Sequence, residues 1–186
     1  MERVFVAILP GKQVLSKIEN FQYAYKTLNR WIPSANIHLT LQFLGWIDTS
    51  ALSSISSHLQ QIAHRTLSFQ VSYESLGLFP NAKRPRILWI GVKEGEKEIF
   101  TITQQLKAAH RRFVVPEEKA YVSHLTVARL KNTSKSALSD IMRTYKDTYF
   151  GKDVVRDIML MRSVLHRSGS VYSILKRFKL RERYND

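Results

Sequence analysis

The stretch NIHLTLQF at residues 36–43 decides how this chain folds, because its pattern returns as VSHLTVAR at residues 122–129. Each stretch holds a His-x-Thr-x tetrad among alternating apolar residues, which is typical of a half-buried strand. His38 and Thr40 therefore share one face, as do His124 and Thr126, while the leucines between them point toward a core. Two such strands side by side would place two histidines in one groove.

Length and charge limit what the chain can be. With 186 residues it can bury one sizeable core, so we expect a single domain of two repeats, about 1–82 and about 83–186. The 29 Lys and Arg against 15 Asp and Glu give a net charge of +14, which favours a polyanionic partner such as RNA. A charge that serves solubility alone is the alternative explanation.

The sequence contains no cysteine, which excludes a disulfide framework and a thiolate metal site and favours a cytoplasmic location. The apolar run at residues 4–9 is too short for a signal peptide or a membrane segment. It is predicted to be the first strand. We expect a monomer without membrane association.

Hydrophobic spacing predicts the order of helices and strands. Steps of three and four predict helices over 12–31, from Asp48 or Thr49 to Ile62, over 96–113, and from Thr133 or Ser134 to Tyr145. Alternating or continuous apolar runs predict strands over 4–9, 36–45, 67–79, 87–90, 122–129, 154–166 and 171–180, the last two joined by a turn at Ser168-Gly169-Ser170.

The spacing also indicates an internal duplication. The strands that follow the tetrads begin near Leu67 and Asp153, and 67 − 38 and 153 − 124 both equal 29. We therefore predict two strand-helix-strand-helix-strand units with the tetrads at matching places. Pseudo-symmetric halves would bring the two tetrad strands together at a common groove.

Two histidines on adjacent strands can divide acid and base roles, because a free imidazole has a pKa of about 6.5. The hydroxyls of Thr40 and Thr126 can donate to the oxygens of an anion between them. The sequence has no carboxylate cluster and no His-x-His pair, which argues against a metal site. It also has no Gly-x-Ser-x-Gly elbow, which argues against a serine nucleophile. Such a site suits in-line attack by water on a cyclic phosphate diester.

At these residues the chain resembles the 2H phosphoesterase superfamily and, within it, the LigT-like branch of RNA 2′,3′-cyclic phosphodiesterases. The resemblance covers nearly the whole chain. Beyond the tetrads it includes FVAI at 5–8, the run from Asn36 to Gly45, RPRILW at 84–89, and the segment from Ser163 to Tyr172. Val122-Ser123 before His124 departs from the Pro-His that is more frequent in that family.

The resemblance implies an α+β fold of two pseudo-symmetric lobes of antiparallel strands, with outer helices, around a central cleft. It implies hydrolysis of RNA 2′,3′-cyclic phosphate ends to 2′-phosphomonoesters without a metal or cofactor, and in some members reversible 2′,5′ ligation. His38 would protonate the leaving O3′ and His124 would activate water. The alternatives are a 2H enzyme for another small cyclic phosphate or a 2′,5′-oligonucleotide, and a non-catalytic RNA-binding module.

Other residues have competing interpretations. Arg129 could bind phosphate, but strict alternation puts it opposite His124 unless a bulge or the strand end intervenes. Phe43 and Trp89 are predicted to lie in the core rather than stack on a base, and Tyr172 is open between these roles. Two sets complete the analysis: the loop residues Lys83, Arg84 and Arg86, which either follow an RNA backbone or are solvated, and the histidines 58, 64, 110 and 166, which are predicted to be structural.

Overall fold

The computed structural model describes residues 1–26, 30–114, 120–130, 133–167 and 169–182. Its strands are β1 (Glu2–Ile8), β2 (Leu39–Ile47), β3 (Phe69–Phe79), β4 (Ile87–Val92), β5 (His124–Arg129), β6 (Tyr149–Val155), β7 (Asp157–His166) and β8 (Gly169–Lys179). Its helices are α1 (Lys12–Ala24), α2 (Leu52–Arg65), α3 (Glu96–His110) and α4 (Lys135–Tyr145), with short 3₁₀ turns at Ser34–Asn36 and Thr49–Ala51.

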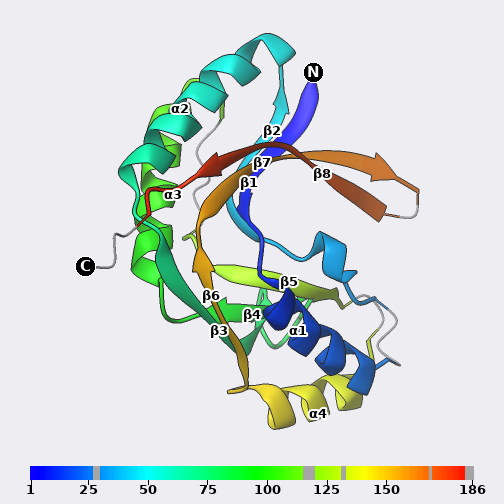
Figure 1. The fold of residues 1–186 in the computed structure, drawn as a ribbon. Helices are drawn as coiled ribbons and strands as arrows, with labels where there is room; N and C mark the ends of the chain where they lie inside the picture. Colours follow the sequence, from blue (N-terminus) through cyan, green and yellow to red (C-terminus); the bar gives the residue numbers. More distant parts are fainter. Residues whose placement is uncertain (27–29, 115–119, 131–132, 168, 183–186) are drawn as a thin grey trace.

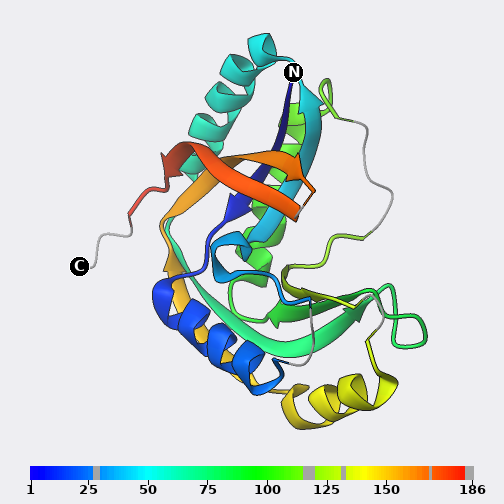
Figure 2. The ribbon, with the colours of Figure 1, turned by 90° about the vertical axis from the view of Figure 1, so that its right-hand side faces the viewer.

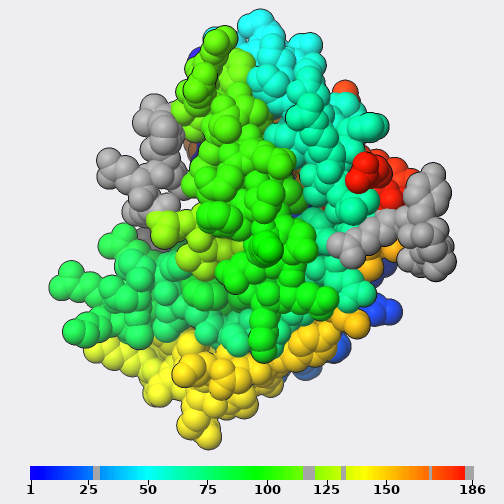
Figure 3. Space-filling view, turned by 90° about the vertical axis from the view of Figure 1, so that its left-hand side faces the viewer, coloured from blue at the N-terminus to red at the C-terminus, as the bar shows by residue number. Residues whose placement is uncertain are grey.

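The eight strands form one curled antiparallel sheet in the order β6-β3-β4-β5-β2-β1-β7-β8 (Figures 1 and 2). The tetrad strands β2 and β5 meet at its centre. Helices α1 and α4 pack against β6 and β3 in one half, and α2 and α3 pack against the other half. Figure 3 shows α2 and α3 side by side on the outer surface, above α4. The expected α+β fold of antiparallel strands with outer helices is confirmed.

Each half of the sheet contains strands from both predicted repeats. β3 follows the first tetrad in the chain, yet it lies between β4 and β6, whereas β7 returns to lie beside β1 and β8 lies beside β7 at the edge. The chain crosses repeatedly between the halves, because α1 and α3 also pack against the half opposite to the strands that flank them in the sequence. This exchange places the two tetrads at the junction of the halves.

Strand β1 shows how the sheet separates its core from its open face. Val4, Val6 and Ile8 belong to the main core under the helices, while Phe5 and Ala7 belong to a smaller buried cluster on the opposite face. This alternation is the period of a strand with both faces covered. The smaller cluster supports the face on which the tetrads lie.

The structure corrects three predicted boundaries. The single strand predicted over 154–166 is wrong: β6 ends at Val155 and pairs with β3, and β7 begins at Asp157 and pairs with β1. Apolar residues lie on both sides of the crossover with only Arg156 and Asp157 between them, so the sequence looks like one strand. The first helix ends at Ala24 rather than 31, and the third at His110 rather than 113. Residue Ser168 of the predicted turn lies outside the described residues.

Candidate active site

The tetrad strands are neighbours, and Leu39 of β2 faces Leu125 of β5 in antiparallel register. Both leucines are 0% exposed, so they fix the strands to the core. Continuing this register sets His38 across from Thr126 and Thr40 across from His124, all on the face away from the core. The sequence-predicted site residues therefore lie together in two crossed His and Thr pairs.

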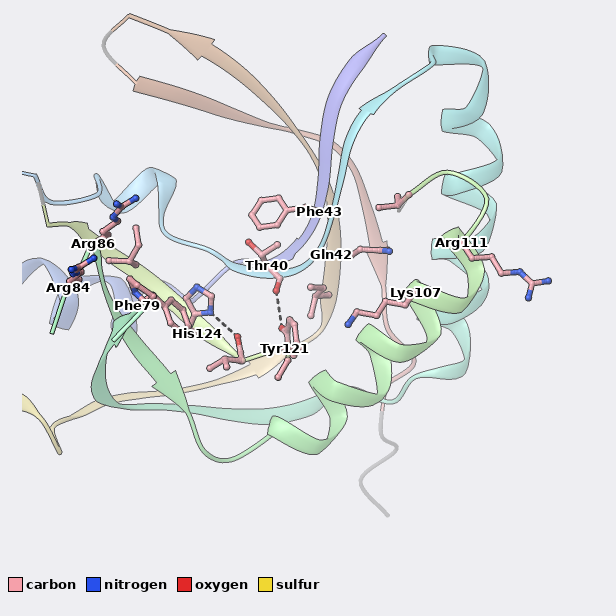
Figure 4. A pocket seen from close by; sticks show the side chains of 16 residues that line it. Thr40, Gln42, Phe43, Phe79, Arg84, Arg86, Lys107, Arg111, Tyr121 and His124 are labelled. Atoms are coloured by element: carbon pink, nitrogen blue, oxygen red, sulfur yellow. Dashed lines mark hydrogen bonds between the residues drawn. The ribbon is translucent and has the colours of Figure 1, made fainter. Parts of the chain in front are cut away.

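Both histidines are oriented by the same backbone hydrogen bond. Nδ1 of His38 lies 2.7 Å from the carbonyl oxygen of Asn36. Nδ1 of His124 lies 2.8 Å from the carbonyl oxygen of Val122, as Figure 4 shows. A carbonyl only accepts, so each Nδ1 carries hydrogen and donates it. Each neutral ring therefore keeps an unprotonated Nε2 for chemistry.

Aromatic rings support each histidine. The His38 ring centroid lies 4.8 Å from that of Phe5 and 5.0 Å from that of Tyr172. The His124 centroid lies 4.9 Å from that of Phe79 and 6.1 Å from that of Trp89. These rings restrict imidazole rotation, which holds Nε2 in place. Among these rings, Tyr172 and Trp89 were considered from the sequence as possible base-stacking residues, with the core position preferred for Trp89.

Trp89 reaches this position because its strand partner is a glycine. Gly77 of β3 pairs with Trp89 of β4, and a β-carbon on Gly77 would overlap the indole ring. The indole therefore lies across the strand and contacts His124 from the open face. The predicted core position of Trp89 is only partly right, since the residue is half-buried beside the histidine.

Burial lowers the pKa of both histidines below the ordinary value. For His38, burial has the largest effect, the hydrogen bond to Asn36 opposes it, and the charge of His124 lowers the pKa further. For His124, burial lowers the pKa and the bond to Val122 opposes the shift. At neutral pH both rings are therefore predominantly neutral in the free protein, and an anion bound between them would favour adding one proton.

Matching β-bulges follow the two tetrads. Thr40 pairs with Ala7 and Gln42 with Val6, which leaves Leu41 as the extra residue. Thr126 pairs with Trp89 and Ala128 with Leu88, which leaves Val127 extra. An extra residue reverses the facing of the residues after it.

The bulges bring Phe43 and Arg129 onto the open face. Phe43 pairs with Phe5 and is 55% exposed, so its predicted core position is wrong. Arg129 pairs with Ile87, which lines the groove, and its side chain is exposed. The bulge at Val127 is the one that the sequence analysis required for Arg129 to share a face with His124. Both residues stand five positions after a tetrad histidine.

A cavity of about 840 Å³ extends from His124 between β2 and α3 (Figure 4). Thr40, Gln42 and Phe43 line it from β2, and Tyr121 lines it from the segment before His124. The Tyr121 hydroxyl donates to the Thr40 carbonyl over 2.9 Å, which ties the two tetrad segments together. Sequence reasoning missed Tyr121 and Gln42, because no pattern distinguishes them from ordinary strand residues.

Cationic side chains lie at both ends of this cavity. Arg84 and Arg86 come from the loop between β3 and β4, Lys107 comes from α3, and Arg111 directly follows α3 (Figure 4). Two members of the predicted basic loop thus line the groove, and Lys83 does not appear in its lining. Lys107 and Arg111 were not recognised in the sequence, since an exposed Lys or Arg in or next to a helix carries no positional signal.

The remaining histidines lie away from the tetrads. His64 and His166 are exposed, while His110 is fully buried with its ring centroid 5.5 Å from that of His58. Within the described ranges, no group of three or more His, Asp or Glu side chains could hold a metal ion. Likewise, none of the described helices is long and apolar enough to cross a membrane.

A family model described as LigT like Phosphoesterase matches residues 9–89 and again residues 90–172. The chain is 32% identical to an RNA 2′,3′-cyclic phosphodiesterase of Aquifex aeolicus, covering 96% of this chain and 97% of the relative. It is 31% identical to an RNA 2′,3′-cyclic phosphodiesterase of Archaeoglobus fulgidus, covering 95% of this chain and 99% of the relative.

Solved structures agree with these sequence matches in fold. TT0787 of Thermus thermophilus superposes with a TM-score of 0.84 at 24% identity, over 98% of this chain and 100% of that one. The apo form of LigT from E. coli superposes with a TM-score of 0.78 at 19% identity, over 97% of this chain and 98% of that one.

Proposed function

Because this chain belongs to the LigT-like phosphoesterase family, we propose that it hydrolyses the 2′,3′-cyclic phosphate ends of RNA to 2′-phosphomonoesters. The observation that carries the proposal is the matched pair of histidines, each with Nδ1 bonded to a carbonyl and Nε2 left for chemistry. The names of the Aquifex and Archaeoglobus relatives support the same substrate.

The phosphorus lies between the two crossed His and Thr pairs. The hydroxyls of Thr40 and Thr126 donate to its nonbridging oxygens, and Arg129 supplies a positive charge on the same face. The phosphate charge raises the proton affinity of the nearby imidazoles, which offsets the effect of burial on their pKa. One histidine is then protonated and the other is neutral.

His124 acts as the general base and His38 as the general acid. Nε2 of His124 takes a proton from water while the water oxygen bonds to phosphorus, and Nε2 of His38 gives its proton to O3′ as the bond from phosphorus to O3′ breaks. The product keeps the phosphate on O2′ and gains a free 3′-hydroxyl. A second turnover requires only that a proton pass from His124 to His38, through solvent or the product.

Every proton transfer in this scheme is assigned to an imidazole, and every anion contact to Thr or Arg. The donor set near the tetrads lacks the carboxylates that hard cations prefer. The proposed reaction therefore requires no metal ion or other cofactor.

Reversible 2′,5′ ligation is a second candidate, favoured by the cations at both ends of the groove. Two RNA ends could then approach phosphorus from opposite sides. A 5′-hydroxyl would replace water as the nucleophile, with the same two histidines exchanging protons.

The test is product analysis with adenosine 2′,3′-cyclic phosphate, with and without a chelator. We expect adenosine 2′-phosphate in both cases. Formation of adenosine 3′-phosphate would contradict the leaving group that we assign, and an inert protein would contradict the activity itself.

A further inference from the structure

The groove is longer than the reacting phosphate requires. Its volume of about 840 Å³ is near the upper end of the range of about 300 to 1,000 Å³ for small-molecule sites. Among the described residues that line it, four are Lys or Arg and none is Asp or Glu. A cyclic phosphate carries one negative charge, which the tetrads and Arg129 already meet. The cations at the ends of the groove therefore suit further phosphates.

The end of the groove beside α3 contains an amide held by a buried histidine. Nδ1 of His110 lies 2.8 Å from Oε1 of Gln42, and the His110 side chain is fully buried. Burial, and secondly the charge of His58, lower the pKa of His110 to about 4, and a hydrogen bond with the Ile55 backbone opposes this shift, so the ring is neutral at pH 7.

The contact with His110 holds the Gln42 side chain at this end of the groove. Because a neutral imidazole has one donor and one acceptor nitrogen, one polar atom of the Gln42 amide bonds the ring and the other remains beside the groove. Figure 4 shows the Gln42 side chain directed from β2 toward α3.

Two cations lie beyond Gln42. Lys107 of α3 is half-buried and points toward Tyr121, and Arg111, the residue directly after α3, lies one helical turn farther with its side chain directed away from the other labelled residues (Figure 4). Their backbones are about 6 Å apart along the helix axis, which is close to the step of one extended nucleotide. No described carboxylate forms an ion pair with either side chain.

We propose that Gln42 and Lys107 form a subsite for the 5′-phosphate of the terminal nucleotide, and that Arg111 contacts the next phosphate upstream. This inference rests on the proposed function, because the terminal nucleotide is the one that carries the cyclic phosphate. The RNA chain then leaves the site past α3. The arginines at the opposite end, Arg84 and Arg86, are exposed on a loop without such a buried support.

A different role for Lys107 and Arg111 would be to stabilise α3. Cations in the last turn of a helix interact favourably with its carbonyl end. In that case their replacement would lower the melting temperature and leave the preference for one substrate over another unchanged. Substrate preference therefore separates the two roles.

The experiment compares adenosine 2′,3′-cyclic phosphate bearing a 5′-hydroxyl with the same nucleotide bearing a 5′-phosphate. We expect the 5′-phosphate to raise kcat/KM of the unaltered protein about tenfold, as a charge-assisted contact does. Lys107→Gln and Gln42→Met should each remove most of this gain. Arg112→Gln is the matched control in the turn directly after α3, since Arg112 lies outside the groove lining, and it should keep the gain.

Arg111 is tested with a trinucleotide that ends in a cyclic phosphate. Arg111→Gln should lower kcat/KM for the trinucleotide and leave the 5′-phosphorylated mononucleotide unaffected. Arg84→Gln should preserve the 5′-phosphate gain; loss of the gain in this variant, with retention in Lys107→Gln, would direct the RNA toward the other end and overturn the proposal.

Equal rates for the two mononucleotides in the unaltered protein would also overturn it. Hydrolysis of both would in that case leave the proposed function standing, whereas failure to hydrolyse either would refute the function itself. Melting temperatures of all variants establish that each is folded at the assay temperature.

Discussion

The two tetrads hold their histidines in the same way, yet the side chains that follow their bulges differ in kind. His38 and His124 share a bond from Nδ1 to the carbonyl two residues earlier and a pair of aromatic neighbours. After the bulges, the first repeat presents Phe43 and the second presents Arg129. The two supported histidines are suited to proton transfer. Phe43 and Arg129 make the two sides of the groove chemically different.

This difference explains how a pseudo-symmetric site can act on an asymmetric substrate. A cyclic phosphate end has an anion on one side and a nucleoside on the other. An exposed ring can stack on a base, while a guanidinium can bind a phosphate oxygen. We therefore expect Phe43 to meet the nucleoside and Arg129 to meet the anion.

The largest loss of activity should come from replacing the histidine that each tetrad contains. His38→Ala and His124→Ala should each reduce kcat by a factor on the order of 10² to 10⁴, because each removes a proton-transfer group. The double variant should be little worse than either single one, since the two groups act in one transition state. His64→Ala, an exposed histidine of α2, is the control and should retain full activity. Strictly multiplicative losses would show that the histidines act independently.

A smaller loss of activity should come from replacing Arg129 or Phe43, the residues that differ between the two repeats. Arg129→Gln should lower kcat/KM about tenfold for every cyclic nucleotide, because it removes a charge-assisted contact to the phosphate. Phe43→Leu should lower it about tenfold for purine substrates through lost stacking, and less for pyrimidines. Steady-state rates on adenosine and uridine 2′,3′-cyclic phosphates measure both effects. Equal base dependence in the two variants would remove the distinction between Phe43 and Arg129.

The coupling between the histidines should appear in their titration. The charge of His124 lowers the pKa of His38, so His124→Ala should raise the pKa of His38 toward about 6.5. NMR titration of the imidazole carbon-bound protons measures the shift. Burial remains in this variant, so the pKa should stay below the free value. An unchanged or lower pKa of His38 would show that the rings do not interact.

The same lowered pKa values predict how stability depends on pH. In the unfolded chain a histidine titrates at about 6.5, so below this pH the unfolded state binds protons that the folded state does not. The free energy of unfolding should therefore fall as the pH drops from about 6.5 toward the folded pKa values. Thermal unfolding at a series of pH values tests this. His38→Ala should show a weaker dependence than the unaltered protein.

A chelator should have the smallest effect, namely none on hydrolysis. No described group of three His, Asp or Glu side chains could form a metal site. Rates measured before and after dialysis against a chelator test the expectation. Lost activity that a single divalent ion restores would contradict the two-histidine reaction.

Much of the fold was predictable, because its strands and helices follow simple periods. The alternation around His38 and His124 predicted that each histidine shares a face with its threonine, and the repeat spacing predicted that the strands would meet. What the pattern hid were places where the period breaks. The bulges at Leu41 and Val127 put Phe43 on the open face, and the crossover after Val155 divides one apparent strand.

The rest of the groove depends on contacts between distant segments. Tyr121 and Lys107 meet β2 only because the chain returns to it after β3 and β4. The place of Trp89 depends on a glycine in a neighbouring strand, which no local pattern indicates. Packing across the sheet, rather than periodicity along the chain, determines these positions.

The most direct test of the division of labour between His38 and His124 is a substrate whose leaving oxygen needs no proton. In a 4-nitrophenyl phosphodiester of a nucleoside, the leaving group departs as a stable phenolate. Loss of the general acid should therefore matter little, whereas the attacking water still needs a general base. We expect this substrate to restore activity to His38→Ala and to leave His124→Ala impaired. Restored activity in His124→Ala with an impaired His38→Ala would reverse the assignment, and equal impairment of both would contradict it.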